Sequence, residues 1–156
     1  MREIELRVTG ANKKIRGNVI LEDVSLTMHS GKICGLQGSN GSGKTMLMRA
    51  ICGLIRLDSG SGSVSGKVLG KDMAFLENTG ILIESPAFLN GYTGLQNLMY
   101  LADIQKRVGR EEVRQTLTRV GLDPDDKRKF RKYSLGMKQR LGIAAATMEK
   151  NEILLI

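Results

Sequence analysis

The sequence predicts an α/β fold with a mostly parallel sheet, and three observations lead to this class. Short apolar runs alternate along the chain with segments whose apolar residues recur at helical spacing. One of these runs leads into a glycine-rich loop that a helical segment follows. The chain has 156 residues, 41% hydrophobic and 26% charged, which is enough to build a globular core. Alternating strands and helices favour a sheet covered by helices.

The first half of the chain contains most of the expected strands. Apolar and polar residues alternate over residues 4–8 and again over 24–28, which predicts two half-buried strands with a loop at 11–18. Beyond them we expect, in chain order, a short apolar strand, a helix, a glycine-rich strand or turn region and a buried strand, over residues 32–38, 45–55, 61–70 and 80–84.

The second half is mainly helical. Apolar residues keep helical spacing over residues 95–102 and 113–120, and Gly121 stands where a C-terminal cap is expected. Ser134 can cap a last helix, which carries an apolar stripe through Leu141 and Met148. Residues 152–156 then predict a closing buried strand.

The net positive charge of the chain allows two interpretations, an anionic partner or a solvated charged surface. A net charge of +8 and a pI near 9.7 permit an anionic partner such as nucleic acid or a membrane face. One basic cluster could contact the phosphates of either, although a solvated charged surface is the simpler explanation. The cluster consists of Lys127, Arg128, Lys129, Arg131 and Lys132.

Other features narrow the class of protein. Cys34 and Cys52 stand far apart without ligand-like neighbours, which predicts reduced, buried thiols and no zinc site. The N-terminus lacks the apolar stretch of a signal peptide, and no run approaches the ~20 apolar residues that span a bilayer. We therefore expect work at a membrane to require a partner.

The strongest motif is GSNGSGKT, Gly38–Thr45, which matches G-x-x-x-x-G-K-[ST] at every fixed position. Backbone N–H groups of such a loop wrap a phosphate, and the N-terminus of the following helix adds its positive dipole end. Lys44 supplies a charge to the terminal phosphates and Thr45 a hydroxyl to Mg²⁺. The predicted ATP-binding residues are Gly38, Ser39, Asn40, Gly41, Ser42, Gly43, Lys44, Thr45 and Met46.

Three later segments indicate what the protein uses the nucleotide for. Glu84 stands at the end of a predicted buried strand, YSLGMKQR (residues 133–140) opens a helix, and NEILLI (residues 151–156) is an apolar strand. In this order and spacing, the whole chain resembles the ATP-binding domain of ABC transporters. GSNGSGKT is similar to that family's Walker A loop, and the segment around Glu84 to its Q-loop. YSLGMKQR is similar to the LSGGQ signature, and NEILLI to the opening of Walker B. The chain most resembles exporter ATPases of the bacitracin and lantibiotic immunity types.

The resemblance implies a P-loop NTPase fold with three parts. These are an N-terminal antiparallel β subdomain with the P-loop core (residues 1–83), a Q-loop and helical subdomain (84–135), and the signature helix with the start of Walker B (136–156). Two such domains would face each other head to tail, as a homodimer or heterodimer. The signature of one, here Ser134, Leu135, Gly136 and Met137, would contact the ATP of the other.

The sequence departs from the family pattern at three places, and one of them is near Ile15, where the family often stacks an aromatic ring on adenine. Glu84 stands where the family usually has Gln. The resemblance still implies a catalytic role there, as a ligand of Mg²⁺ or in orienting water, but with added negative charge. Leu135 and Met137 replace a Gly and a Gln of the signature, so that fewer polar contacts are expected.

In the family, Walker B ends in an Asp for Mg²⁺ and a catalytic Glu, and this sequence stops just before them. The resemblance therefore implies an incomplete central parallel sheet and a chain that binds ATP but hydrolyses it poorly or not at all. We expect such a fragment to self-associate through exposed sheet edges.

The leading hypothesis is thus the ATPase subunit of an exporter, with ATP and Mg²⁺ as cofactors. It would lie in the cytoplasm, on the membrane face, through a transmembrane permease subunit. The alternatives are a soluble ABC-type ATPase that acts on nucleic acid or ribosomes, and a nucleotide-binding fragment without turnover. Nucleic acid is not the expected partner, because there is no coiled-coil insertion between P-loop and signature.

Overall fold

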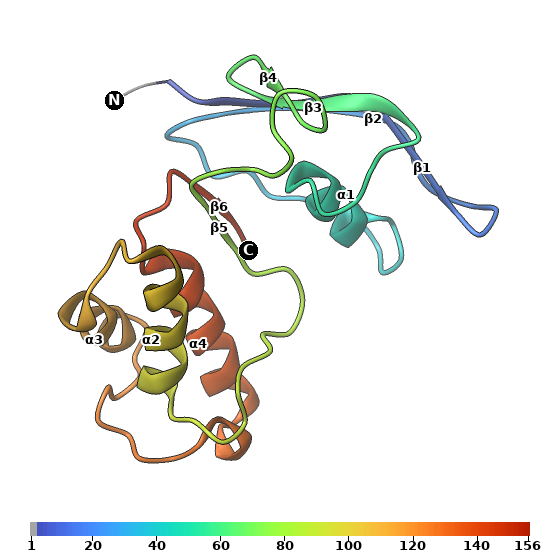
Figure 1. Ribbon diagram of the computed structural model, residues 1–156. Helices are drawn as coiled ribbons and strands as arrows, with labels where there is room; N and C mark the ends of the chain where they lie inside the picture. Colours follow the sequence, from blue (N-terminus) through green and yellow to red (C-terminus); the bar gives the residue numbers. More distant parts are fainter. Residues whose placement is uncertain (1–2) are drawn as a thin grey trace. The chain divides into compact units, whose positions relative to one another are not determined.

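The computed structural model describes residues 3–156, which divide into two compact units between Glu77 and Asn78. Strands β1 to β4 and helix α1 belong to the first unit. Strands β5 and β6 and helices α2 to α4 belong to the second (Figure 1). None of the helices within the described residues is long and apolar enough to cross a membrane.

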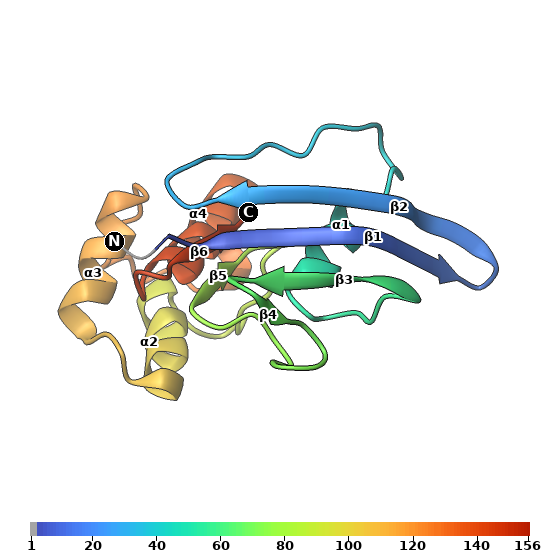
Figure 2. The same ribbon diagram turned by 90° about the horizontal axis from the view of Figure 1, so that it is seen from above.

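The first unit is built on an antiparallel sheet in the order β2-β1-β3-β4 (Figure 2). Its strands are β1 (Glu5–Ile15), β2 (Asn18–His29), β3 (Ser59–Val64) and β4 (Lys67–Val68). Leu6 and Val8 alternate with exposed residues and are buried, as the sequence pattern predicts. The predicted strand over residues 24–28 lies within β2, and the glycine-rich segment 61–70 supplies β3 and β4.

The loop predicted at residues 11–18 is wrong, because β1 continues through this polar segment to Ile15. A two-residue turn, Arg16 and Gly17, then connects β1 to β2, and both residues have positive φ (50° and 82°). Asp58 stabilises the polar end of the strand. It accepts hydrogen bonds from Lys13 Nζ at 2.8 Å and from the Lys14 backbone N–H at 2.6 Å.

Helix α1 (Lys44–Ile51) follows the glycine-rich loop, as predicted. Leu47, Ala50 and Ile51 are its buried residues, and Cys52 directly after it is also buried. Burial raises the pKa of the Cys52 thiol to about 11, which keeps it protonated and unreactive.

The apolar strand predicted over residues 32–38 does not form. These residues are exposed, including Ile33 and Leu36, because no strand of the described chain pairs with them. A strand needs hydrogen bonds from a neighbour, so an apolar sequence alone does not produce one. Cys34 lies in this segment and is exposed, which corrects the prediction of two buried thiols.

The second unit contains a parallel pair of strands, β5 (Thr79–Ile81) and β6 (Ile153–Leu155). They pair in the register Thr79 with Ile153 and Ile81 with Leu155. The predicted strand over residues 80–84 is therefore shorter than expected, and the closing strand forms as predicted. Gly80 is required here, because a Cβ at this position would overlap the backbone carbonyl of Ala146.

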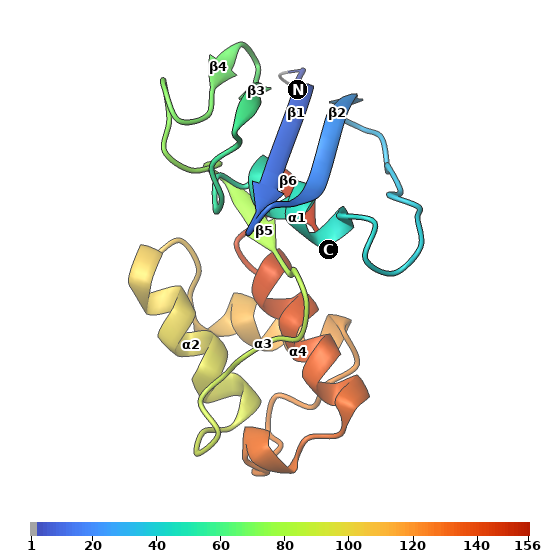
Figure 3. The same cartoon turned by 90° about the vertical axis from the view of Figure 1, so that its right-hand side faces the viewer.

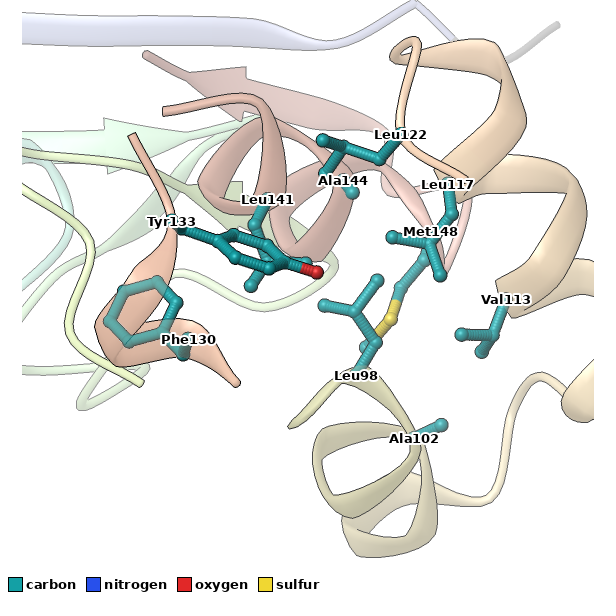
Figure 4. Close-up of a cluster of buried hydrophobic side chains, with 10 residues drawn as sticks. All are labelled: Leu98, Ala102, Val113, Leu117, Leu122, Phe130, Tyr133, Leu141, Ala144 and Met148. Carbon is teal, nitrogen blue, oxygen red and sulfur yellow. The ribbon is translucent and has the colours of Figure 1, made fainter. Parts of the chain in front are cut away.

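Three helices pack against one another in the second unit (Figure 3). They are α2 (Gly94–Gln105), α3 (Arg110–Arg119) and α4 (Leu135–Thr147), and a short 3-10 helix, η1 (Phe130–Lys132), precedes α4. The helical spacing had predicted all three. Figure 4 shows side chains from each of them meeting in one cluster. The buried cluster consists of Leu98, Ala102, Val113, Leu117, Leu122, Phe130, Tyr133, Leu141, Ala144 and Met148.

Candidate functional site

The glycine-rich loop Gly38–Thr45 leads directly into the N-terminus of α1. The first hydrogen bond within the helix runs from the Leu47 N–H to the Gly43 carbonyl oxygen, at 2.8 Å. The N–H groups of Lys44, Thr45 and Met46 come before it and so have no acceptor within the helix. Gly43, the N-cap residue, offers no side chain to take their place. This helix end therefore presents backbone donors to an anion.

Two glycines allow the loop to close this tightly. A Cβ at Gly38 would lie 2.5 Å from the Ser42 hydroxyl oxygen. Gly43 has φ of +88°, and a Cβ there would lie 2.5 Å from the carbonyl oxygen of Ile20. Gly43 therefore requires glycine for both space and backbone conformation, whereas a Cβ at Gly38 would have to displace the Ser42 hydroxyl. The spacing of the motif predicted this requirement.

Lys44 lies across the loop. Its ammonium group donates to the carbonyl oxygens of Gly38 at 2.6 Å and of Ser39 at 2.8 Å. A lysine ammonium has three donors, so one remains for a ligand. The Ser42 N–H donates to the Ser39 carbonyl at 3.2 Å and completes a turn inside the loop. No residue of the loop carries a negative charge, and its donors suit the oxygens of a polyphosphate.

The residues predicted to bind Mg²⁺ belong to different units, Thr45 to the first and Glu84 to the second. Residues 3–156 contain no cluster of three or more His, Cys, Asp or Glu side chains that could hold a metal ion by itself. Proteins usually bind Mg²⁺ through a few protein oxygens together with phosphate oxygens of the substrate. The hydroxyl of half-buried Thr45 is suited to be one of these protein ligands.

Glu84 lies in the loop between β5 and α2 and is exposed. Its φ is 72°, in the left-handed region that residues with a Cβ rarely adopt. Holding such a conformation costs about 1–3 kcal/mol. Six other non-glycine residues among those described also have positive φ, so the conformation alone does not mark a functional residue. The sequence marked this position for its charge, and the backbone strain is an independent feature that only the structure shows.

The signature residues form the start of α4. The Ser134 hydroxyl accepts a hydrogen bond from the Met137 N–H at 3.2 Å, which confirms the predicted helix cap. Leu135 is exposed and Gly136 has open space around it. The preceding residue, Tyr133, is buried, and its hydroxyl oxygen accepts from the Gly94 N–H at 3.2 Å. This helix end is therefore open to solvent and fixed to the start of α2.

Sequence reasoning missed Asn97, a buried polar residue of α2. Its side-chain oxygen accepts from the Leu89 N–H at 2.8 Å. Its side-chain nitrogen donates to the carbonyls of Leu89 at 3.2 Å, Tyr92 at 3.4 Å and Thr93 at 3.0 Å. The available signal was a polar residue in the apolar part of a predicted helix, directly before Leu98.

The loop that Asn97 holds, residues 89–93, is also attached to η1. The Phe130 N–H donates to the Tyr92 carbonyl at 2.8 Å, and the Arg131 N–H to the Asn90 carbonyl at 3.3 Å. Since η1 leads into Ser134, hydrogen bonds connect the segment after Glu84 with the segment that enters the signature. The two predicted site regions of this unit are thus connected through backbone hydrogen bonds.

Comparison with known proteins agrees with this geometry. The family model described as ABC transporter matches residues 21–156. The chain belongs to the ABC transporter family. An uncharacterized ABC transporter ATP-binding protein, YybJ of Bacillus subtilis, is 43% identical to it over 151 residues, which are 97% of this chain and 69% of that protein. The family predicted from the P-loop and the signature is thereby confirmed.

Named transport proteins of this ABC transporter family are also similar. The bacitracin transport ATP-binding protein BcrA of Enterococcus faecalis is 35% identical, over 99% of this chain and 50% of that protein. The lantibiotic transport ATP-binding protein SrtF of Streptococcus pyogenes is 31% identical, over 97% of this chain and 65% of that protein. The chain thus spans about half to two thirds of the length of the curated relatives that it matches.

A solved structure described as the ATP-binding subunit of an ABC transporter shares the fold. It superimposes with a TM-score of 0.80 at 23% sequence identity and covers 96% of this chain and 64% of that one. The likeness confirms the predicted α/β fold with an N-terminal antiparallel sheet. The expectation of a mostly parallel sheet is wrong for the described residues, because β1 to β4 pair antiparallel and only β5 and β6 pair in parallel.

Proposed function

We propose that the chain is the ATP-binding part of an exporter, in which ATP binding and hydrolysis by the whole protein drive a substrate across the membrane. The observation that carries the proposal is the P-loop itself, with uncapped helix donors at one end and the Lys44 ammonium across it. The bacitracin and lantibiotic transport proteins among its relatives suggest a peptide antibiotic or a drug as the substrate.

The P-loop would bind the phosphates of ATP. Backbone N–H groups at the start of α1, those of Lys44, Thr45 and Met46, would donate to phosphate oxygens, and the remaining donor of Lys44 would contact the terminal phosphates. The Thr45 hydroxyl would hold Mg²⁺, which neutralises phosphate charge when bound. Two hydrogen bonds to the carbonyl oxygens of Gly38 and Ser39 hold Lys44 across the loop, which lowers the ordering entropy that this side chain loses on binding.

Glu84 and the signature are the proposed site residues of the second unit. The carboxylate of Glu84, held in its strained conformation, would orient water or help to hold Mg²⁺. The signature, Ser134 to Met137, would donate to the ATP of a second ATP-binding domain through the exposed start of α4. Such a domain and a transmembrane permease subunit are the proposed partners, at the cytoplasmic face of the membrane.

Calorimetric titration with Mg-ATP, ATP in EDTA and adenosine tests this function. We expect ATP to bind at least about tenfold more tightly than adenosine, because charge-assisted contacts to phosphates dominate the site. Removal of Mg²⁺ should weaken binding by a smaller factor. Equal affinity for adenosine and ATP, or no binding of ATP, would contradict the proposal.

A further inference from the structure

The first unit contains a pocket with a volume of about 770 Å³. Its walls come from the end of α1, the segment over residues 53–59, strands β3 and β4, and the turn over residues 69–74. The volume falls within the range of about 300–1,000 Å³ that is typical of ligand pockets. No residue of the P-loop lines the pocket, so it is separate from the proposed ATP site.

Backbone hydrogen bonds fix the turn that forms one wall of the pocket. The Leu69 N–H donates to the Gly62 carbonyl at 2.8 Å, and the Gly70 N–H donates to the Met73 carbonyl at 2.7 Å. Gly62 leaves the space that the Leu69 side chain needs, since a Cβ at Gly62 would lie 3.1 Å from Leu69 Cδ1. This wall is therefore formed before a ligand binds, which lowers the ordering entropy that binding costs.

The end of α1 forms another wall, and its last carbonyls already have donors. The Gly53 N–H donates to the Ala50 carbonyl at 3.1 Å, and the Leu54 N–H donates to the Arg49 carbonyl at 2.9 Å. The negative end of a helix dipole arises from carbonyls without a partner. Because these carbonyls are capped, this helix end opposes an anionic ligand only weakly.

Two cations and two carboxylates line the pocket, and the carboxylates are the groups that already have donors. Asp58 forms an ion pair with Lys13 at 2.8 Å, and Asp72 accepts a hydrogen bond from a backbone N–H at 2.8 Å. Arg56 and Lys71 form no ion pair within residues 3–156. Since Lys13 neutralises Asp58, two cations remain against one carboxylate, and the pocket favours a ligand with a single negative charge.

The remainder of the lining is largely apolar and contains no aromatic ring. Each of its five large apolar side chains is partly buried and leaves part of its surface open to a ligand. These side chains are Ile55, Leu57, Val68, Leu69 and Met73. A nucleotide base would find no ring to stack on, whereas an aliphatic chain would lose its contact with water.

We propose that this pocket binds a small monocarboxylate with an apolar chain. The planar guanidinium of Arg56 matches the two oxygens of a carboxylate, and the Lys71 ammonium adds a second charge-assisted contact. The apolar lining would cover the chain of the ligand. The inference goes beyond the proposed function and does not depend on it, because the two sites share no residue.

Titration of octanoate into the whole chain labelled with nitrogen-15, followed through its amide chemical shifts, tests the inference. Octanoate should shift the amides of residues 60–62 and 69–73 in a saturable way. Octylammonium has the same chain with the opposite charge, and acetate has the carboxylate without the chain. Both should bind at least about tenfold more weakly, because each lacks one of the two kinds of contact.

Two results of these titrations would overturn the inference. Equal binding of octylammonium and octanoate would show that the cations of the pocket select no charge. Octanoate shifts confined to the exposed apolar segment over residues 32–36 would show that the ligand binds to apolar surface and not to the pocket.

A charge variant combines Arg56→Gln with Lys71→Gln. Both positions are exposed, so the variant is expected to fold like the unmodified chain. Its affinity for octanoate should fall at least about tenfold, because two charge-assisted contacts are lost. Arg16→Gln with Lys67→Gln is the matched control, which removes the same charges at exposed positions outside the pocket and should leave the affinity unchanged. Equal losses in the two variants would overturn the inference.

Mg-ATP titration keeps this inference apart from the proposed function. The charge variant should bind Mg-ATP as tightly as the unmodified chain does. A chain that binds octanoate in the pocket but binds no ATP would refute the proposed function and leave this inference standing. A chain that binds ATP but shows no saturable octanoate shifts at residues 60–62 and 69–73 would overturn this inference alone.

Discussion

The three helices of the second unit and the segment that leads into the P-loop differ in how far their apolar side chains are buried. The helices bury Leu98, Leu117 and Leu141 almost completely in one cluster. The segment over residues 32–36 leaves Ile33 fully exposed, although its sequence is equally apolar. Yet the loop that follows this segment is held by local contacts of Lys44 and Ser42. Phosphate-loop geometry is thus a local property, whereas a buried strand depends on a neighbour.

The largest expected effect lies in the helical cluster. Leu98→Ala should lower the free energy of unfolding of this unit by about 2–5 kcal/mol, through lost burial and the cavity left behind. Ile33→Ala is the matched control and should change stability by less than about 0.5 kcal/mol, as for other surface positions. Urea unfolding followed by helical circular dichroism measures both. Equal losses would mean that residues 32–36 pack against a neighbour in solution.

Asn97 offers a second test, because its buried side-chain amide forms hydrogen bonds with the loop over residues 89–93. Asn97→Ala should cost about 2 kcal/mol, since the Leu89 N–H loses its acceptor and three carbonyls lose one of their two donors. Thr116→Ala is the control. This side chain is equally buried but bonds only to the Glu112 carbonyl of its own helix, so a smaller loss is expected.

Amide exchange shows whether Asn97 acts through the loop. Faster exchange at Leu89 and Phe130 in the Asn97 variant, but not in the Thr116 variant, is the predicted result. Unchanged exchange at these two amides would show that Asn97 stabilises α2 alone.

The two helix starts at the candidate sites provide a third contrast. Ser134 caps α4 with its hydroxyl, whereas α1 begins at Gly43 without a side-chain cap. Ser134→Ala should therefore destabilise the second unit by about 1 kcal/mol. Ser134→Asp should restore most of this stability but place a negative charge where the proposed phosphate contact lies. Thermal unfolding of the variants compares them, and full stability of the alanine variant would argue against the cap.

The smallest effect concerns acid sensitivity. The hydrogen bond from Lys13, with one from the Lys14 backbone, lowers the pKa of Asp58 in the first unit. The hydrogen bond from Arg114 lowers the pKa of Asp125 in the second. A depressed folded-state pKa gives stability that is present above the unfolded pKa, about 4, and is lost as pH falls through the folded value.

Asp58→Asn and Asp125→Asn should each flatten the decline in stability between neutral and acid pH, and should do so slightly, because both carboxylates are exposed. Urea midpoints at neutral pH and near pH 3 measure the change in slope. A steeper decline in either variant would contradict the assigned pairing.

Local signals made much of the fold predictable. Helical spacing located α2, α3 and α4, and the cap at Ser134 follows from its hydroxyl and its place before an apolar stripe. The P-loop conformation depends on Gly43, whose positive φ and closeness to the Ile20 carbonyl oxygen exclude a Cβ. The helices and the cap depend on residues within a few positions of one another, whereas the need for Gly43 also involves Ile20 of β2.

The features that the sequence failed to predict all depend on residues that are far apart in the chain. β1 extends through its polar end because Asp58, more than forty positions away, binds Lys13 and Lys14. Residues 32–38 were predicted to form a strand from composition, but pairing decides whether one forms. The role of Asn97 depends on a loop that folds back onto α2, and single-sequence patterns do not show such a contact.

The central claim is that the loop across which Lys44 lies is a phosphate site. Titration of Mg-ATP into Lys44→Ala tests it most directly, with Lys71→Ala, an exposed lysine of the same unit, as the control. Affinity should fall at least about tenfold in the first variant, because a charge-assisted contact to the terminal phosphates is lost, and should be unchanged in the second. Equal affinity of Lys44→Ala and the unmodified chain for Mg-ATP would contradict the account.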